Sequence, residues 1–118
     1  MVLLDRVAAQ EYASWFRALA DPTRVQLVEL LARTKRPMSV GEIVTEMGLA
    51  QSTVSQHLKI LAECDLVKPK QEGREIYYEL EVSKMKEIDK WLDQFRKIWE
   101  GRFQELDKVL SKLQNRKK

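Results

Sequence analysis

The chain has 118 residues, of which 44% are hydrophobic and 33% charged. This composition is too apolar for a disordered chain and too charged for a membrane-embedded protein, and the length suits one domain with one core. The formal net charge of +3 is a weak indication of an anionic partner.

The charge is unevenly distributed along the chain. Residues 1–40 carry a net charge of +2, residues 41–82 carry −4, and residues 83–118 carry +5. Because the middle segment is acidic, any binding of an anion there depends on which side chains face outward, and not on bulk charge.

The chain contains no apolar run near the ~20 residues that a membrane span requires. Charged and polar residues from Asp5 to Glu11 interrupt the apolar start, so no signal peptide is expected. Cys64 is the only cysteine, which excludes an intrachain disulfide. We expect a soluble, cytoplasmic protein that does not contact membranes.

Two helices are predicted before residue 37. Residues 6–19 have apolar side chains at helical spacing and contain neither glycine nor proline. Asp21 and Pro22 mark the start of a second helix, as N-cap and first helical residue. Residues 25–31 of this helix are apolar nearly all round, which is typical of a buried helix, and Pro37 lies beyond its end.

A helix-turn-helix pattern spans residues 39–63. Ser39 opens a short helix with Glu42 as its capping-box partner, and Gly48 follows its last residue, Met47. The second helix, residues 51–63, has one apolar and one polar face. The apolar face carries Val54, Leu58 and Leu61, and the polar face carries Gln51, Ser52, Ser55, Gln56 and Lys59.

A two-stranded wing is predicted over residues 66–81. Residues 67–70 and 75–80 alternate as strands do, and Gly73 lies in the turn between them. Pro69 suits only an edge strand. Ser83 then starts a helix that extends to about Leu113. The predicted fold is therefore mainly α with a small β-hairpin: one winged helix-turn-helix domain over residues 1–118, with a long C-terminal helix.

Three motifs resemble the ArsR-type family of bacterial and archaeal repressors. They are LADPTR at residues 19–24, QSTVSQHLKIL at 51–61 and GREIYY at 73–78, and the resemblance covers residues 12–82. It implies a homodimeric transcriptional regulator that binds an operator in double-stranded DNA. Residues 95–113 resemble family members that lack metal sites.

The polar face of the second helix is the predicted reader of DNA. Serine, threonine and glutamine donate and accept hydrogen bonds at base edges, and lysine reaches guanine or phosphate. Residues 51–56 include poor helix formers and no charge, whereas a merely solvated face, the alternative, favours Glu–Lys pairs. The candidate DNA-binding residues of this helix are Gln51, Ser52, Thr53, Ser55, Gln56 and Lys59.

Basic residues of the wing are candidates for contacts with flanking DNA. Arg74 lies at the turn, and Lys68 and Lys70 lie along the first strand. Alternatively, these residues only balance neighbouring glutamates. Ser39 is a further candidate, since it starts a helix whose N–H groups suit a phosphate, but it serves equally well as a simple N-cap.

Neither a metal site, a cofactor site nor a catalytic site is expected. His57 is the only histidine, and we expect it to pack or to touch phosphate, because no second histidine or cysteine pair accompanies it. The acidic neighbours of Cys64 would raise its pKa, which argues against a redox switch. Asp65 stands where the resembled family usually has glycine. The sequence identifies no small-molecule inducer.

The C-terminal helix carries a heptad-like apolar stripe that is too long for one small domain to cover. Pairing in a homodimer would cover it, with the first helix as a second contributor. Alternatively, the helix breaks near Gly101 and packs within its own chain. The predicted dimer interface consists of Tyr12, Trp15, Phe16, Leu92, Phe95, Trp99, Phe103, Leu106 and Leu110.

The sequence thus favours a homodimeric repressor, without enzymatic activity, that binds an inverted-repeat operator. The second helix of the helix-turn-helix would enter the major groove and the wing would contact flanking DNA. The alternative is a coiled-coil-like protein–protein interaction module without specific DNA binding, which the acidic middle segment would suit.

Overall fold

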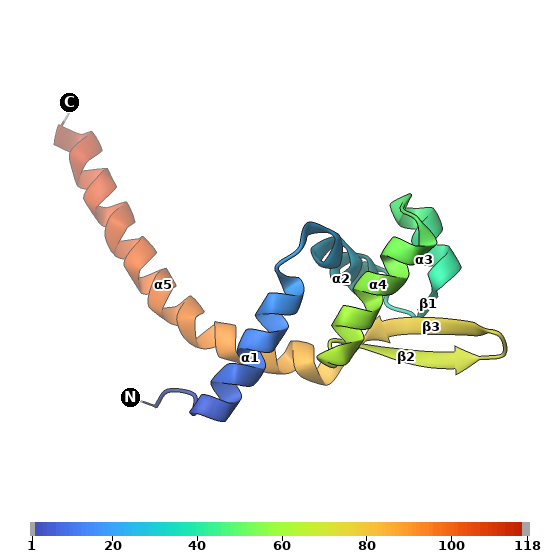
Figure 1. The fold of residues 1–118 in the computed structure, drawn as a ribbon. Coiled ribbons are helices and arrows are strands. Elements are labelled where there is room, and N and C mark those ends of the chain that lie inside the picture. Colours follow the sequence, from blue (N-terminus) through green and yellow to red (C-terminus); the bar gives the residue numbers. More distant parts are fainter. Residues whose placement is uncertain (1, 117–118) are drawn as a thin grey trace. The chain divides into compact units, whose positions relative to one another are not determined.

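The computed structural model describes residues 2–116 and contains five helices and a small antiparallel sheet (Figure 1). The helices are α1 (Arg6–Leu19), α2 (Pro22–Thr34), α3 (Val40–Met47), α4 (Gln51–Glu63) and α5 (Val82–Arg116). The strands are β1 (Met38–Ser39), β2 (Val67–Glu72) and β3 (Glu75–Leu80). The predicted fold class, a winged helix-turn-helix with a long C-terminal helix, is confirmed.

The chain forms two compact units, and the boundary falls inside α5. The first unit ends at Met85 and the second begins at Lys86. The organisation of residues 1–118 as one domain stays a prediction.

Local capping signals set the starts of the first helices. Asp5 precedes α1 and its carboxylate accepts the N–H of Ala8 at 2.8 Å. Asp21 caps α2 in the same way by accepting the N–H of Arg24 at 3.1 Å, and Pro22 is the first helical residue, as predicted. The bond from the Arg24 backbone lowers the pKa of Asp21, because it stabilises the charged carboxylate.

The core of the first unit lies where α1–α4 and the base of the sheet meet. Each of these four helices contributes at least one buried apolar side chain, and α4 contributes three that are 0% exposed. The largest fully buried side chains are Trp15, Leu27, Met38, Ile43, Val54, Leu58, Leu61, Leu66 and Val67.

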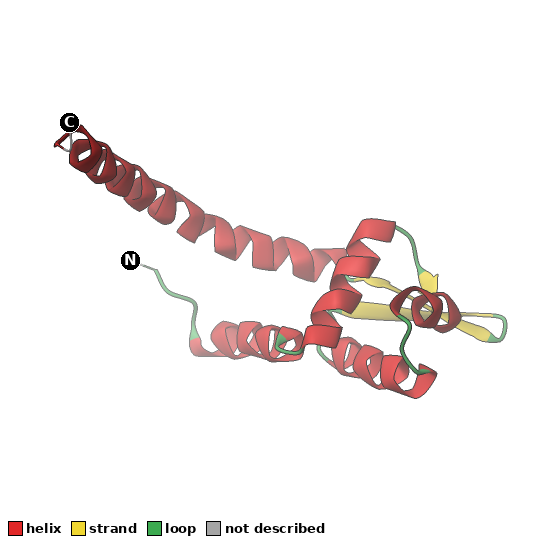
Figure 2. Ribbon diagram, turned by 90° about the horizontal axis from the view of Figure 1, so that it is seen from above, coloured by secondary structure: helices red, strands yellow, loops and turns green. Residues whose placement is uncertain are grey.

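The wing, defined here as the β2–β3 hairpin (Val67–Leu80), pairs in register from Val67 opposite Leu80 to Glu72 opposite Glu75. Gly73 in its turn has a φ of 64°, which favours glycine. The strand order β1-β3-β2 leaves β2 at an edge, so Pro69 costs no ladder bond within the sheet. In two perpendicular views the turn of the wing points away from α1 (Figures 1 and 2).

A third strand, β1, was not expected from the sequence. Met38 pairs with Tyr78 and Ser39 with Tyr77, which joins the start of α3 to the wing. Two residues are too few to show the alternation that identifies a strand. Only the pairing with β3 defines β1.

Helix α5 begins one residue earlier and ends later than predicted. Ser83 is the second helical residue, and its hydroxyl donates to the Glu81 carboxylate at 3.0 Å, so its expected role as the cap is corrected. The helix continues through Gly101. The break that the intrachain alternative places near Gly101 is therefore not found in the described helix.

Candidate nucleic-acid interface

Helix α4 presents one polar face to solvent. Gln51, Ser52, Ser55, Gln56 and Lys59 are exposed, and Thr53 is half-buried at the edge of this face. The opposite face is completely buried, so the rotation of α4 about its axis is determined by the core. The structure therefore gathers the six residues that the sequence singled out in this helix.

The polar face of α4 makes no side-chain hydrogen bond or ion pair to any other part of residues 2–116. Ala50 precedes the helix and provides no side-chain cap. Donors and acceptors on this face are thus available to an external ligand.

The polar face and the wing border one hollow with a volume of about 540 Å³. Gln51 and Ser55 line it from α4, and Arg74 lines it from the turn of the wing. Val40 and Gly41 contribute from the first turn of α3. A ligand in this hollow would meet hydrogen-bonding groups on the α4 side, and on the wing side it would meet Arg74 next to Glu75.

The other basic residues of the wing have acidic neighbours. Lys70 Nζ lies 3.5 Å from a Glu72 carboxylate oxygen, and Lys68 Nζ lies 3.5 Å from one of Glu79. Both pairs are exposed, and such pairs are weak enough to exchange for another anion. At both lysines these pairs support the alternative to a DNA contact, in which the lysine only balances the charge of a neighbouring glutamate.

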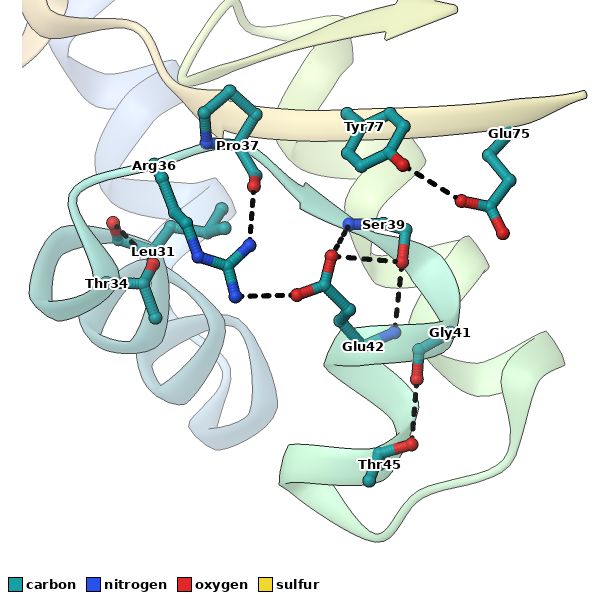
Figure 3. A network of polar contacts seen from close by, with 10 residues as sticks. All are labelled: Leu31, Thr34, Arg36, Pro37, Ser39, Gly41, Glu42, Thr45, Glu75 and Tyr77. Atoms are coloured by element: carbon teal, nitrogen blue, oxygen red, sulfur yellow. Dashed lines mark hydrogen bonds and ion pairs between the residues drawn. The ribbon is translucent and has the colours of Figure 1, made fainter. Parts of the chain in front are cut away.

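Ser39 is buried, with 6% of its surface exposed, and it belongs to a polar network at the start of α3 (Figure 3). Its hydroxyl accepts the N–H of Glu42 at 3.2 Å, and the Glu42 carboxylate accepts the N–H of Ser39 at 3.3 Å. The capping box is confirmed. Ser39 therefore serves as the N-cap of α3, and it also lines the hollow beside α4, so its candidacy for DNA contact stays a prediction.

Arg36 completes this network. Its guanidinium donates to the Glu42 carboxylate at 2.6 Å and to the carbonyl of Pro37 at 3.1 Å (Figure 3). The bond from Arg36, followed by that from the Ser39 backbone, lowers the pKa of Glu42. The loop before β1 is thereby tied to the first turn of α3, which borders the hollow.

One of the three aromatic residues proposed for a dimer contact in α1 is a core residue. Trp15 is 1% exposed, and its ring meets that of Tyr12 edge-on, with centroids 4.7 Å apart. Lys84 Nζ lies 5.4 Å from the centroid of the Trp15 ring. Because Trp15 is buried within the single chain, the prediction that it contacts a second copy is corrected, whereas Tyr12 is half-buried and Phe16 is 38% exposed.

The apolar stripe of α5 is exposed in the single chain. No residue of this helix, which lies wholly within the described part of the chain, is buried. The six stripe residues proposed for the dimer interface are 38% to 57% exposed: Leu92, Phe95, Trp99, Phe103, Leu106 and Leu110.

His57 lies on the flank of α4 in a charged cluster that sequence reasoning missed. Its Nδ1 is 3.2 Å from Nη1 of Arg24 and 3.8 Å from a carboxylate oxygen of Asp21. Asp21 was predicted as the cap of α2 and Arg24 belongs to the LADPTR motif, but nothing in the sequence indicated that α2 begins beside α4.

Two further features of the described residues bear on candidate sites. No group of three or more histidine, cysteine or acidic side chains in residues 2–116 is placed to hold a metal ion, and no helix there is both long and apolar enough to cross a membrane.

Burial, followed by the charges of Asp65 and Glu63, raises the pKa of the Cys64 thiol. This disfavours a reactive thiolate.

Comparisons with known proteins agree with this geometry. Residues 21–68 match the family described as bacterial regulatory protein, arsR family. An HTH-type transcriptional regulator of Methanocaldococcus jannaschii is 36% identical over 85 residues, which cover 72% of this chain and 94% of that protein. A transcriptional repressor SmtB homolog of Synechocystis is 42% identical over 72 residues, covering 61% of this chain but only 53% of that protein.

Among solved structures, a similar one is the homodimeric winged helix-turn-helix DNA-binding domain of a possible ArsR-family regulator from Mycobacterium bovis. It has a TM-score of 0.61 and 28% sequence identity, covering 80% of this chain and 90% of that chain. These relatives are named as transcriptional regulators, and none as an enzyme. The chain belongs to the arsR family of bacterial regulatory proteins.

Proposed function

We propose that this protein is a homodimeric, sequence-specific DNA-binding repressor that recognises an inverted-repeat operator. In this proposal α4 enters the major groove, and Arg74 contacts the backbone of flanking DNA. No catalytic step is involved.

The observation that carries the proposal is the free polar face of α4. Gln51, Ser52, Ser55 and Gln56 are exposed opposite a fully buried stripe, and none is engaged within the described chain. Glutamine can bond adenine with two hydrogen bonds, and serine can bond several bases. Such a face suits base edges better than it suits solvent.

The position of Arg74 supports the same proposal. It shares a hollow with Gln51 and Ser55, so a backbone contact at the wing and base contacts at α4 are compatible with one duplex. Lysine and arginine contacts to phosphate position a protein on DNA, while contacts to base edges supply the sequence preference.

Two lines of support favour a homodimer. The Mycobacterium bovis domain, which has the same fold, is homodimeric. The stripe of α5 leaves large apolar side chains such as Trp99 and Phe103 about half exposed in one chain, which a second copy would cover. A twofold pair of α4 helices would then read two half-sites roughly 34–36 Å apart. The repressor role is supported by the name of the Synechocystis relative.

Selection from a random duplex pool, followed by fluorescence-anisotropy titration of the enriched sequence, tests this function. The expected result is an inverted repeat that binds at least about a thousandfold tighter than random duplex. Ser52→Ala/Gln56→Ala should lose most of this preference. The matched control, Glu29→Ala, changes an exposed residue of α2 and should keep it. Failure to enrich any sequence, with weak binding at all salt concentrations, would favour the protein–protein interaction module instead.

A further inference from the structure

Arg24 connects three helices of the first unit. Its Nε donates to the carbonyl of Ala18, which lies in the last turn of α1. Its backbone N–H donates to the Asp21 cap of α2, and its Nη1 lies 3.2 Å from Nδ1 of His57 in α4. Carbonyls in the last turn of a helix have no partner within that helix, so the bond to Ala18 is a structural one. Arg24 thereby holds the His57 ring at a defined place beside α1 and α2.

The contact with Arg24 determines which ring nitrogen of His57 carries the proton. A guanidinium has only donors, so Nδ1 must accept, and the proton of the neutral ring lies on Nε2. The other charged group near Nδ1 is Asp21, whose oxygen is 3.8 Å away, too far for a hydrogen bond. That oxygen instead accepts the N–H of Arg24.

The Nε2–H group of His57 reaches the surface. The His57 side chain is 18% exposed, and its contacts to Arg24 and Asp21 both use Nδ1. Within residues 2–116, no fully buried side-chain nitrogen or oxygen lacks a hydrogen-bond partner, so the unbonded Nε2 is accessible. His57 lies one turn after Thr53, on the half-buried flank of α4 between the polar face and the buried stripe.

We propose that Nε2–H of His57 donates a hydrogen bond to a DNA phosphate, and that Arg24 is the positioning residue that keeps this donor in place. The inference rests on the proposed function and adds a backbone contact to it. On the flank of a helix seated in the major groove, a side chain meets the sugar–phosphate backbone sooner than it meets base edges. The contact therefore contributes affinity and register but no sequence preference.

Nitrogen-15 NMR of the unmodified protein tests the tautomer directly. His57 is the only histidine of the chain, so the imidazole signals come from this ring alone. The expected spectrum of the free protein is that of the Nε2–H tautomer, with the Nε2 signal shifting when random duplex is added. A ring protonated on Nδ1, or an Nε2 signal that duplex leaves unchanged, overturns the inference.

Two substitutions of His57 separate its nitrogens. The amide of His57→Gln can place a donor near the position of Nε2, whereas that of His57→Asn extends only as far as Nδ1. We expect His57→Gln to bind duplex nearly as tightly as the parent. His57→Asn should raise the dissociation constant about tenfold, for operator and random duplex alike. Because a neutral donor releases no counterion, the slope of affinity against salt should not change.

Substitution of Arg24 tests its role. Arg24→Lys keeps the charge but cannot bond Ala18 and His57 together, so the ring should sample both tautomers and DNA binding should weaken. In the double variant Arg24→Lys/His57→Asn the two losses should not add. Additive losses, or a ring tautomer unaffected by Arg24→Lys, contradict the positioning role.

The failure of this inference can be told apart from failure of the proposed function. If the parent binds duplex and His57→Asn binds it equally well, only the His57 contact is wrong. If the parent binds no duplex at all, the proposed function is wrong and the contact is overturned with it.

Discussion

Gln51, the first residue of α4, and Arg74, in the turn of the wing, line the same hollow. The pairing of β1 with β3 joins the start of α3 to the wing, and α3 packs on α4, so both residues are held by one connected set of elements. A duplex seated against α4 would therefore have Arg74 within reach of its backbone. The two kinds of contact are expected to respond differently to substitution.

Substitution on the polar face of α4 should reduce the affinity for operator but not for random DNA. Gln56→Ala or Ser52→Ala should cost about 1–3 kcal/mol on the operator, because the loss of a good side-chain contact to a base has this magnitude. Anisotropy titrations with operator and random duplex measure both affinities. If Gln56→Ala and Ser52→Ala both bind the operator as tightly as the parent protein, residues other than Gln56 and Ser52 read the bases.

Removal of the Arg74 charge should weaken binding to operator and random duplex alike. Each phosphate contact releases about one counterion, so Arg74→Ala should flatten the plot of log affinity against log salt by about one unit. Lys70→Ala should have a smaller effect, since Lys70 already pairs with Glu72. An unchanged salt slope for Arg74→Ala would place this side chain away from the phosphates.

Dimerisation and operator binding should weaken together when the stripe of α5 is truncated. Trp99 is 49% exposed in the single chain and would be buried in the proposed dimer. Truncation of a buried aromatic side chain costs about 3–5 kcal/mol. Trp99→Ala should raise the dimer dissociation constant and lower operator affinity, as sedimentation equilibrium and titration would measure. Lys108→Ala, an exposed residue of the same helix, is the matched control.

Two results would contradict this coupling. A folded, monomeric Trp99→Ala protein with parental operator affinity would separate dimerisation from DNA binding. A dimeric variant with unchanged operator affinity would move the dimer interface away from Trp99.

The stability contributed by Glu42 should depend on pH. Arg36 lowers the pKa of Glu42 in the folded chain. A carboxyl with a lower pKa in the folded than in the unfolded state stabilises the fold above its unfolded pKa, and this stabilisation is lost as pH falls through the folded pKa. Glu42→Gln keeps a capping-box side chain but removes the charge. Its thermal midpoint should lie below that of the parent at neutral pH, and the difference should vanish in acid.

The matched control for Glu42 is Glu29→Gln, which removes a more exposed ion pair with Arg33. It should change the thermal midpoint less at neutral pH, because exposed pairs contribute little. A difference between Glu42→Gln and the parent that is constant from neutral pH to acid would show that the charge of Glu42 is not its source.

Replacement of Asp65 by glycine should stabilise the protein. Asp65 has a φ of 59° after the end of α4. Its N–H donates to the carbonyl of Ala62, and that of Leu66 donates to the carbonyl of Leu61, which is the Schellman arrangement. Glycine adopts this conformation without the Cβ penalty, so Asp65→Gly should add about 0.5–1 kcal/mol to the free energy of unfolding. Urea denaturation measures the change, and a loss of stability would indicate that the Asp65 side chain itself matters.

The sequence alone determined most of the local structure. Asp21 with Pro22, Ser39 with Glu42, and Gly48 mark helix ends through bonds and φ angles that span only a few residues, and the structure has all three. The polar face of α4 was equally readable, because helical periodicity places its residues on one side whatever the helix packs against.

Only the tertiary structure decided which side chains are available and which meet across the chain. Trp15 and Ser39 look like surface candidates in sequence but are buried, because neighbouring elements cover them. The contact of Arg24 with His57 joins helices whose relative placement no local pattern encodes. Caps and periodicity follow from a few consecutive residues, whereas burial and long-range contacts depend on how separate apolar faces pack together.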